Sequence, residues 1–172
     1  MNQFQTELDV ATIDYNKQLK TDLTAYFQAT NPKIVILDMF TNGLLSYYSK
    51  ILLENVSQNM HLICNEALSF NTLLNAPSNL YEIPPNKTFV ENTASFLTKR
   101  YQTNIGIAVA GIHDFEEKEN KIYIGYSFYN NTISRIIECS GSQEIRYNQI
   151  INSVFGYLKM LFIKYPIINK RS

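Results

Sequence analysis

The segment KIVILDMF, residues 33–40, constrains the fold most strongly, because it is continuously apolar and rich in β-branched residues. A strand with this pattern is typically buried on both faces of a sheet that has helices above and below it. Thr41-Asn42-Gly43 follow directly, and residues 43–55 then repeat their apolar positions at helical spacing. A buried strand, a polar turn and a helix in this order predict an α/β protein with a ligand site at the turn.

The rest of the chain alternates between helix-like and strand-like segments. Further helices are predicted at residues 4–28, 87–101 and 142–165, the first ended by Asn31-Pro32 and the last capped by Ser142. Further strands are predicted at 60–66 and 104–112. The small residues of the second strand suit close packing by helices. A short helical turn and a long surface connection are expected between residues 66 and 87.

Two β-rich runs, KIYIGYSFY (121–129) and TISRIIEC (132–139), flank Asn130-Asn131. Asparagine tolerates the positive φ of a tight turn, so these runs predict an antiparallel hairpin at the edge of the sheet. Together the elements predict a three-layer α/β/α sandwich with a mixed central sheet. The length of 172 residues suits one domain, residues 1–172, with its own core.

The charge balance excludes some classes of partner. Fifteen Lys and Arg residues offset fifteen Asp and Glu residues, so no basic excess is available for nucleic acid or an anionic membrane surface. No apolar run approaches the length of a membrane span. The chain opens with no secretion signal, so we expect a cytoplasmic protein in which Cys64 and Cys139 are reduced thiols.

Four short motifs, in order and with matching spacing, resemble the C-terminal domain of the CinA family, whose active members are nicotinamide-nucleotide amidases. Asp38-Met39-Phe40-Thr41-Asn42-Gly43 stands where the family has Glu-Ser-Cys-Thr-Gly-Gly. Ile63-Cys64-Asn65-Glu66-Ala67-Leu68 matches Tyr-Ser-Asn-x-x-Lys, GIAVAGIHDF (106–115) matches a strand ending in Thr-Gly-Ile-Ala-Gly-Pro, and GSQEIR (141–146) matches Gly-Asp-Arg…Ile-Arg. The resemblance covers nearly the whole chain and implies the same sandwich fold.

The resemblance also implies that the amidase chemistry is lost. In the active family the serine of the first motif is the nucleophile and the lysine of the second is its base. Met39 and Leu68 occupy those positions here. A thioether and an isobutyl group can neither attack an amide nor accept a proton. We therefore predict a catalytically inactive, CinA-like protein without catalytic residues, metal or cofactor.

A ligand pocket inherited from the family would have both favourable and unfavourable groups. Its predicted members are Asp38, Thr41, Asn42, Gly43, Cys64, Asn65, Gly111, His113 and Arg146. Backbone N–H groups of residues 41–43 could bind the anionic part of a pyridine nucleotide, or Thr41 or Asn42 could simply cap the following helix. The carboxylates of the 114–119 loop (Asp114, Glu116, Glu117 and Glu119) would repel a nucleotide phosphate.

Three functional hypotheses follow from these residues. The leading one is a structural or regulatory interaction module that forms homo-oligomers or binds a protein partner, in line with twelve Tyr and ten Phe residues. The second is a nucleotide sensor that uses residues 41–43 and Arg146. The third is a hydrolase with Cys64 as a relocated nucleophile, although His61, three residues away on a predicted strand, would point to the opposite face.

Overall fold

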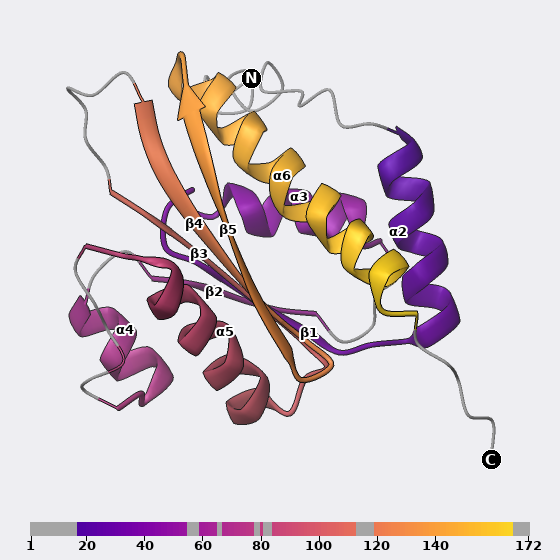
Figure 1. Ribbon diagram of the computed structural model, residues 1–172, viewed down its shortest axis with the longest axis horizontal. Coiled ribbons are helices and arrows are strands. Elements are labelled where there is room, and N and C mark those ends of the chain that lie inside the picture. Colours follow the sequence, from indigo (N-terminus) through magenta and orange to yellow (C-terminus); the bar gives the residue numbers. More distant parts are fainter. Residues whose placement is uncertain are drawn as a thin grey trace, which may run out of the picture.

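The computed structural model describes residues 17–54, 59–64, 67–77, 80, 84–112 and 119–166, with the side chains of residues 67–69 and 119 left out. Five strands form one mixed sheet in the order β2-β1-β3-β4-β5 (Figure 1). The strands are β1 (Ile34–Asp38), β2 (Asn59–Ile63), β3 (Ile105–Gly111), β4 (Glu119–Phe128) and β5 (Asn131–Ser140). The helices are α2 (Lys17–Thr30), α3 (Leu44–Leu52), α4 (Ala67–Leu74), α5 (Lys87–Tyr101) and α6 (Gln143–Lys164).

The sheet joins a parallel half to an antiparallel half. Strand β1 pairs in parallel with β2 on one side and β3 on the other. Strands β3, β4 and β5 then continue the sheet by antiparallel pairing. Since β1 lies between two parallel neighbours and is buried over its whole length, its uninterrupted apolar sequence has the burial that was predicted for it.

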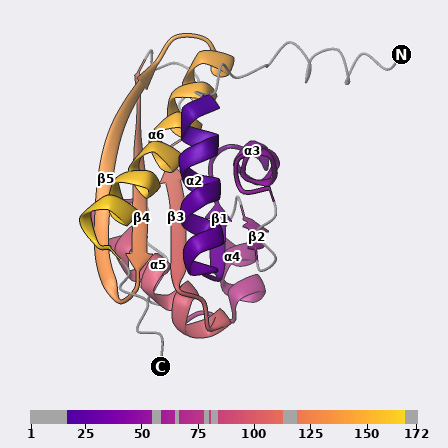
Figure 2. The same cartoon turned by 90° about the vertical axis from the view of Figure 1, so that its right-hand side faces the viewer.

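Helices cover both faces of this sheet (Figure 2). Helices α2, α3 and α6 share one core with alternate strand residues such as Ile34, Ile36 and Ile107. Helix α5 and the Phe70 and Leu74 side chains of α4 share the second core with the intervening residues, such as Val35 and Leu37. The predicted three-layer α/β/α sandwich with a mixed central sheet is therefore confirmed. None of the described helices has the length and apolar character that crossing a bilayer requires.

Most element boundaries agree with the sequence, and the differences have local causes. Helix α5 spans the predicted residues 87–101, and the Ser142 side chain caps α6 as expected. Strand β1 ends at Asp38 rather than at Phe40, because the chain turns at residues 39–43. The first predicted helix, 4–28, is described only from Lys17, and it extends to Thr30.

The predicted hairpin is present, but its turn is shifted by one residue. The two turn positions are Tyr129 and Asn130, with φ angles of 46° and 70°, and Asn131 is already paired with Phe128 as the first residue of β5. Two consecutive positive φ angles give the twist that a two-residue hairpin loop requires. The sequence pointed to the asparagine pair, whereas the pairing of Phe128 with Asn131 places Tyr129 in the turn.

Candidate functional site

The Asp38 carboxylate organises the turn between β1 and α3. It is fully buried and accepts hydrogen bonds from the backbone N–H groups of Phe40 (3.0 Å), Thr41 (2.7 Å) and Gly43 (2.9 Å). The Thr41 hydroxyl also donates to it. A buried carboxylate is stabilised by such donors, and the N-terminal end of a helix favours a negative charge. The chain thus supplies its own anion at this helix end.

The N-cap residue of α3 is Gly43, which makes no side-chain cap bond, so neither Thr41 nor Asn42 is the N-cap residue. Thr41 stabilises the start of the helix from two positions earlier. Its hydroxyl oxygen accepts from the Leu45 N–H at 3.0 Å while its hydrogen is donated to Asp38. Asn42 and Gly43 both adopt positive φ angles, 53° and 94°. Three of the backbone N–H groups between residues 40 and 43 are already bonded to Asp38. These contacts favour a role for Thr41 in stabilising the start of the helix. They do not favour the alternative, in which the backbone N–H groups bind a phosphate.

Met39 and Phe40 leave the turn in opposite directions. The half-buried Met39 packs against the core that includes Leu37 and Cys64. Phe40 is only 3% exposed and belongs to the other core, where its ring lies 6.4 Å, centroid to centroid, from that of Tyr147 in a T-shaped arrangement. Both side chains are packing groups in this structure, and neither carries a group that can transfer a proton.

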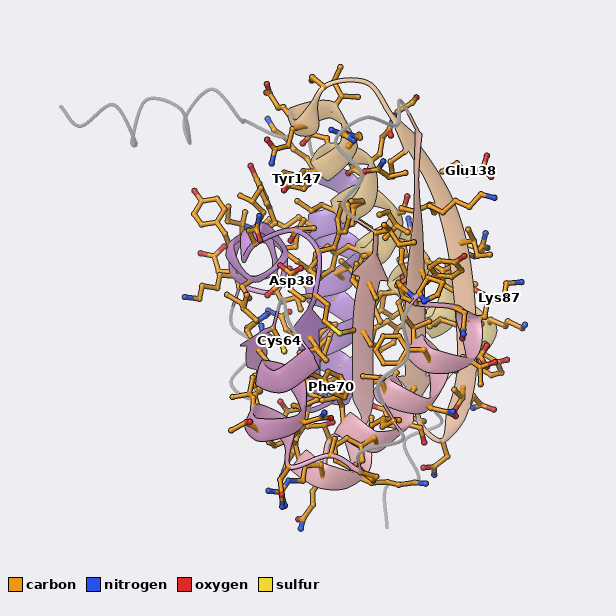
Figure 3. The ribbon with its side chains drawn as sticks, turned by 90° about the vertical axis from the view of Figure 1, so that its left-hand side faces the viewer. Asp38, Cys64, Phe70, Lys87, Glu138 and Tyr147 are labelled. Carbon is orange, nitrogen blue, oxygen red and sulfur yellow. The ribbon has the colours of Figure 1, made fainter. Side chains whose placement is uncertain are left out.

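Cys64 and Gly111 lie beside this turn. The Cys64 N–H donates to the Asp38 carbonyl oxygen at 3.0 Å, and Figure 3 shows Cys64 next to Asp38. The Cys64 side chain is 3% exposed. A Cβ added at Gly111 would lie 2.8 Å from the Phe40 ring, so this glycine makes room for phenylalanine. The structure therefore gathers Asp38, Thr41, Gly43, Cys64 and Gly111 in one place.

Arg146 lies in the first turns of α6 and contacts a different element. Its guanidinium donates to the Asn120 side-chain oxygen of β4 at 2.9 Å. The nearby Cys139 is fully buried, and burial, opposed by the charge of Arg146, raises the pKa of its thiol to about 11. Cys64 and Cys139 are not joined in a disulfide. Cys139 is thus a small buried residue of the core.

A contact between Ser49 and His61 was missed by the sequence analysis. The Ser49 hydroxyl oxygen lies 2.7 Å from His61 Nε2, and Asn59 Nδ2 donates to the same hydroxyl at 3.5 Å. Burial, reinforced by the charge of Lys50 and opposed by that of Asp38, lowers the pKa of His61 to about 4. His61 Nδ1 has no hydrogen-bond partner among the described residues, and His61 Nε2 is the ring nitrogen that meets Ser49.

Ser49 itself is fully buried within α3, where its hydroxyl contacts His61 and Asn59 of β2. The pair was hidden in the sequence because Ser49 interrupts an apolar helix and His61 interrupts an apolar strand. Only the packing of α3 on β2 brings them together.

Some predicted site residues lie outside the described part of the chain. Asn65 and His113 belong to this group, as do Asp114, Glu116 and Glu117. Leu68 lies in α4 and Glu119 in β4, but their side chains are not described. Their roles at the pocket therefore stay predictions.

A cavity of about 220 Å³ lies elsewhere, between α6 and the β4–β5 hairpin. Apolar and polar side chains line it together with Gly156: Ile124, Arg135, Ile137, Asn152, Ser153, Tyr157 and Met160. None of the predicted ligand-binding residues is among them. The turn after β1 and this cavity are thus separate features.

Solved structures of similar fold connect this geometry to known proteins. A competence damage-inducible protein A from Klebsiella pneumoniae matches with a TM-score of 0.75 and 12% identity, over 86% of this chain and 97% of that one. A competence or damage-inducible protein from Enterobacter asburiae matches with a TM-score of 0.72 and 16% identity, over 83% and 95% of the two chains.

A competence/damage inducible protein from Agrobacterium tumefaciens matches with a TM-score of 0.64 and 14% identity, over 84% of this chain and 93% of that one. No protein-family model matches the sequence, and no curated protein matches it either. The likeness is therefore one of fold, it extends over most of both chains, and it agrees with the resemblance in the sequence motifs. The chain has the fold of the CinA superfamily of competence- or damage-inducible proteins.

Proposed function

We propose that this chain is a non-catalytic member of the CinA-like proteins that acts as a structural or regulatory interaction module and forms homo-oligomers. The observation that carries the proposal is the packing at residues 39 and 40. The first motif of the active family places its nucleophile at the position of Met39. A methionine side chain that packs into the core offers neither a nucleophile nor a base.

The contacts of Asp38 support the same proposal. The carboxylate is bonded to the N–H groups that a substrate phosphate would need at this helix end. Phe40 packs against Gly111 and the Tyr147 ring, so an apolar side chain occupies this side of the turn. These contacts stabilise the fold and favour a packed turn over a ligand site.

The burial of Cys64 argues against the hypothesis of a hydrolase with Cys64 as its nucleophile. Cys64 is 3% exposed, and His61 is bonded to Ser49. A relocated nucleophile needs access to its substrate and a base within hydrogen-bond reach. Cysteines that are not joined in a disulfide suit a reducing compartment, so we propose a cytoplasmic location.

The test of this proposal is an assay of ammonia release from nicotinamide mononucleotide by the purified full-length chain. An active nicotinamide-nucleotide amidase serves as the positive control. We expect no ammonia above the blank, because the two catalytic groups of the active family are absent. Saturable ammonia release that disappears on heat denaturation would contradict the proposal.

The variant Met39→Ser restores the serine of the active family and tests whether Leu68 at the lysine position prevents catalysis. We expect Met39→Ser to remain inactive, because a serine hydroxyl needs a base to remove its proton and Leu68 cannot supply one. The folded state of this variant is checked by circular dichroism and by its thermal midpoint. Ammonia release by Met39→Ser alone would mean that another residue acts as the base and would contradict the assignment of position 68.

A further inference from the structure

Helix α6 runs along the β4–β5 hairpin (Figure 2), and the cavity between them lies over a glycine of the helix. Asn152, Gly156 and Met160 recur at every fourth position, so they form one row along the helix surface. All three line the cavity of about 220 Å³. A Cβ added at Gly156 would meet no atom within 4 Å. The glycine therefore leaves a gap in the row, and this gap is part of the cavity.

Packing does not require a glycine at position 156. The residue lies well inside α6, and glycine is among the least favourable residues in a helix interior. At Gly125, by contrast, an added Cβ would lie 2.1 Å from the Val90 carbonyl oxygen, so a close neighbour explains that glycine. Positions that break a local preference without a packing reason are often functional. What Gly156 provides is the open space above it.

Arg135 places a positive charge on the strand side of this space. Strand pairing sets Arg135 opposite Ile124, and both side chains line the cavity. The guanidinium lies over the Tyr157 ring, 4.0 Å from its centroid. A cation–π contact holds the group in position but satisfies none of its N–H donors with an oxygen acceptor. The ion pairs of the described residues involve other side chains, so Arg135 has no carboxylate partner among them.

The rest of the lining has an apolar and a polar part. Ile124, Ile137 and Met160 supply apolar surface, while Asn152 and Ser153 supply an amide and a hydroxyl. Apolar walls with a few placed polar groups are typical of sites for small molecules. The volume of about 220 Å³ is below the range of about 300–1,000 Å³ for drug-sized ligands. The cavity thus suits a smaller molecule with an apolar body.

We propose that this cavity binds small monocarboxylic acids with an apolar, single-ring body. A guanidinium forms two parallel hydrogen bonds with a carboxylate, and the single charge of Arg135 balances that of one carboxylate. A phosphate monoester carries a charge of about −1.5 to −2 at neutral pH and favours several donors or a helix N-terminus. Gly156 lies in the middle of α6, and Arg135 is the one charged residue among the described residues that line the cavity.

The walls of the cavity define how such an acid binds. Its carboxylate meets the Arg135 guanidinium, which the Tyr157 ring holds in place. Its apolar body lies over Gly156 and contacts Ile137 and Met160, so apolar surface of both is removed from water. This site is separate from the turn after β1. The proposal therefore goes beyond the non-catalytic role and does not depend on the result of the ammonia assay.

An NMR titration of the isotope-labelled full chain tests the proposal with phenylacetate and its neutral counterpart, phenylacetamide. We expect phenylacetate to shift the amide resonances of residues 152–160 saturably, with a Kd on the order of 1 mM for so small a ligand. Phenylacetamide should bind at least about tenfold more weakly, because it lacks the charge that pairs with Arg135. Shifts centred on the turn after β1, or tighter binding of phenyl phosphate than of phenylacetate, would overturn the proposal.

Two variants and a control distinguish this site from weak binding elsewhere on the surface. Arg135→Gln should weaken phenylacetate binding at least about tenfold. Lys164→Gln should bind as the wild type does, because Lys164 also lies over a tyrosine ring, 5.3 Å from the Tyr165 centroid, but does not line the cavity. Gly156→Leu should abolish binding without lowering the thermal midpoint, since leucine fills the open space and favours a helix. No saturable shift in the wild type, or unchanged affinity in both cavity variants, would overturn the proposal.

Discussion

The Thr41 hydroxyl donates a hydrogen bond to the buried Asp38 carboxylate and so ties the start of α3 to the end of β1. The same hydroxyl accepts from the Leu45 N–H, so one side chain links the carboxylate to the helix. The backbone N–H groups of this turn could bind an anionic ligand, but three of them are already bonded to the Asp38 carboxylate. The turn is built for stability.

Replacing Asp38 by Asn tests this role. The variant removes the negative charge and leaves one acceptor oxygen for several donors, so we expect the free energy of unfolding to fall by about 2–4 kcal/mol. Chemical denaturation measures the change. Glu54→Gln is the control, because this exposed residue pairs with Lys20 on the surface and its loss should leave the midpoint nearly unchanged. Equal midpoints for Asp38→Asn and the wild type would contradict the account.

Two glycines predict opposite effects of the same substitution. A Cβ at Gly125 would lie 2.1 Å from the Val90 carbonyl oxygen, so Gly125→Ala must push α5 away from β4, at a cost on the order of 3 kcal/mol. A Cβ at Gly156 meets no atom within 4 Å, and alanine favours a helix interior by up to about 1 kcal/mol. Gly156→Ala should therefore raise the thermal midpoint while Gly125→Ala lowers it. A stabilised Gly125→Ala variant would disprove this packing.

His61 predicts a specific dependence of stability on pH. Its pKa is about 4 in the folded state and about 6.5 when unfolded, so the unfolded state binds more protons between these values. Stability from this group is fully present above pH 6.5 and is lost as the pH falls toward 4; because solvent screens the partly exposed ring, we expect a loss on the order of 1–2 kcal/mol. His61→Gln should flatten this part of the curve. Parallel wild-type and variant curves from urea titrations between pH 4 and 7 would contradict the prediction.

The cysteines predict slow alkylation of the native protein. Cys64 is 3% exposed, which limits access of a reagent to its thiol, and Cys139 is fully buried with a raised pKa, so little thiolate is available there. We expect iodoacetamide at neutral pH to label both residues quickly in urea and neither in buffer, as measured by mass spectrometry of peptides. Rapid native labelling of Cys64 would revive the hypothesis of a relocated nucleophile.

The fold was largely predictable because its layers follow directly from hydrophobic patterns. The continuous apolar run at 34–37 indicated a strand with helices on both sides, and the Ser142 cap located the start of α6. The hairpin turn was less predictable, since asparagine at positions 130 and 131 suggested the turn while strand pairing decided it.

The candidate site was predictable only in part. The motif positions gave the correct neighbours for Asp38, Thr41, Gly43 and Cys64, because the carboxyl end of β1 and that of β2 meet at one edge of the sheet. The partners of individual side chains were not predictable. That Asp38 would bond to its own turn, and that His61 would meet Ser49, depends on the packing of α3, which no local pattern encodes.

Isothermal titration of nicotinamide mononucleotide into the purified protein tests the central claim most directly, because one trace reports both binding and turnover. The account predicts no heat beyond dilution at two temperatures, as the turn after β1 is filled by Phe40 and bonded to Asp38. A sustained heat flow would mean that the amidase chemistry survives, and saturable heat without turnover would mean that the pocket still binds its nucleotide. Either result would contradict the claim that this turn stabilises the fold and does not bind a nucleotide.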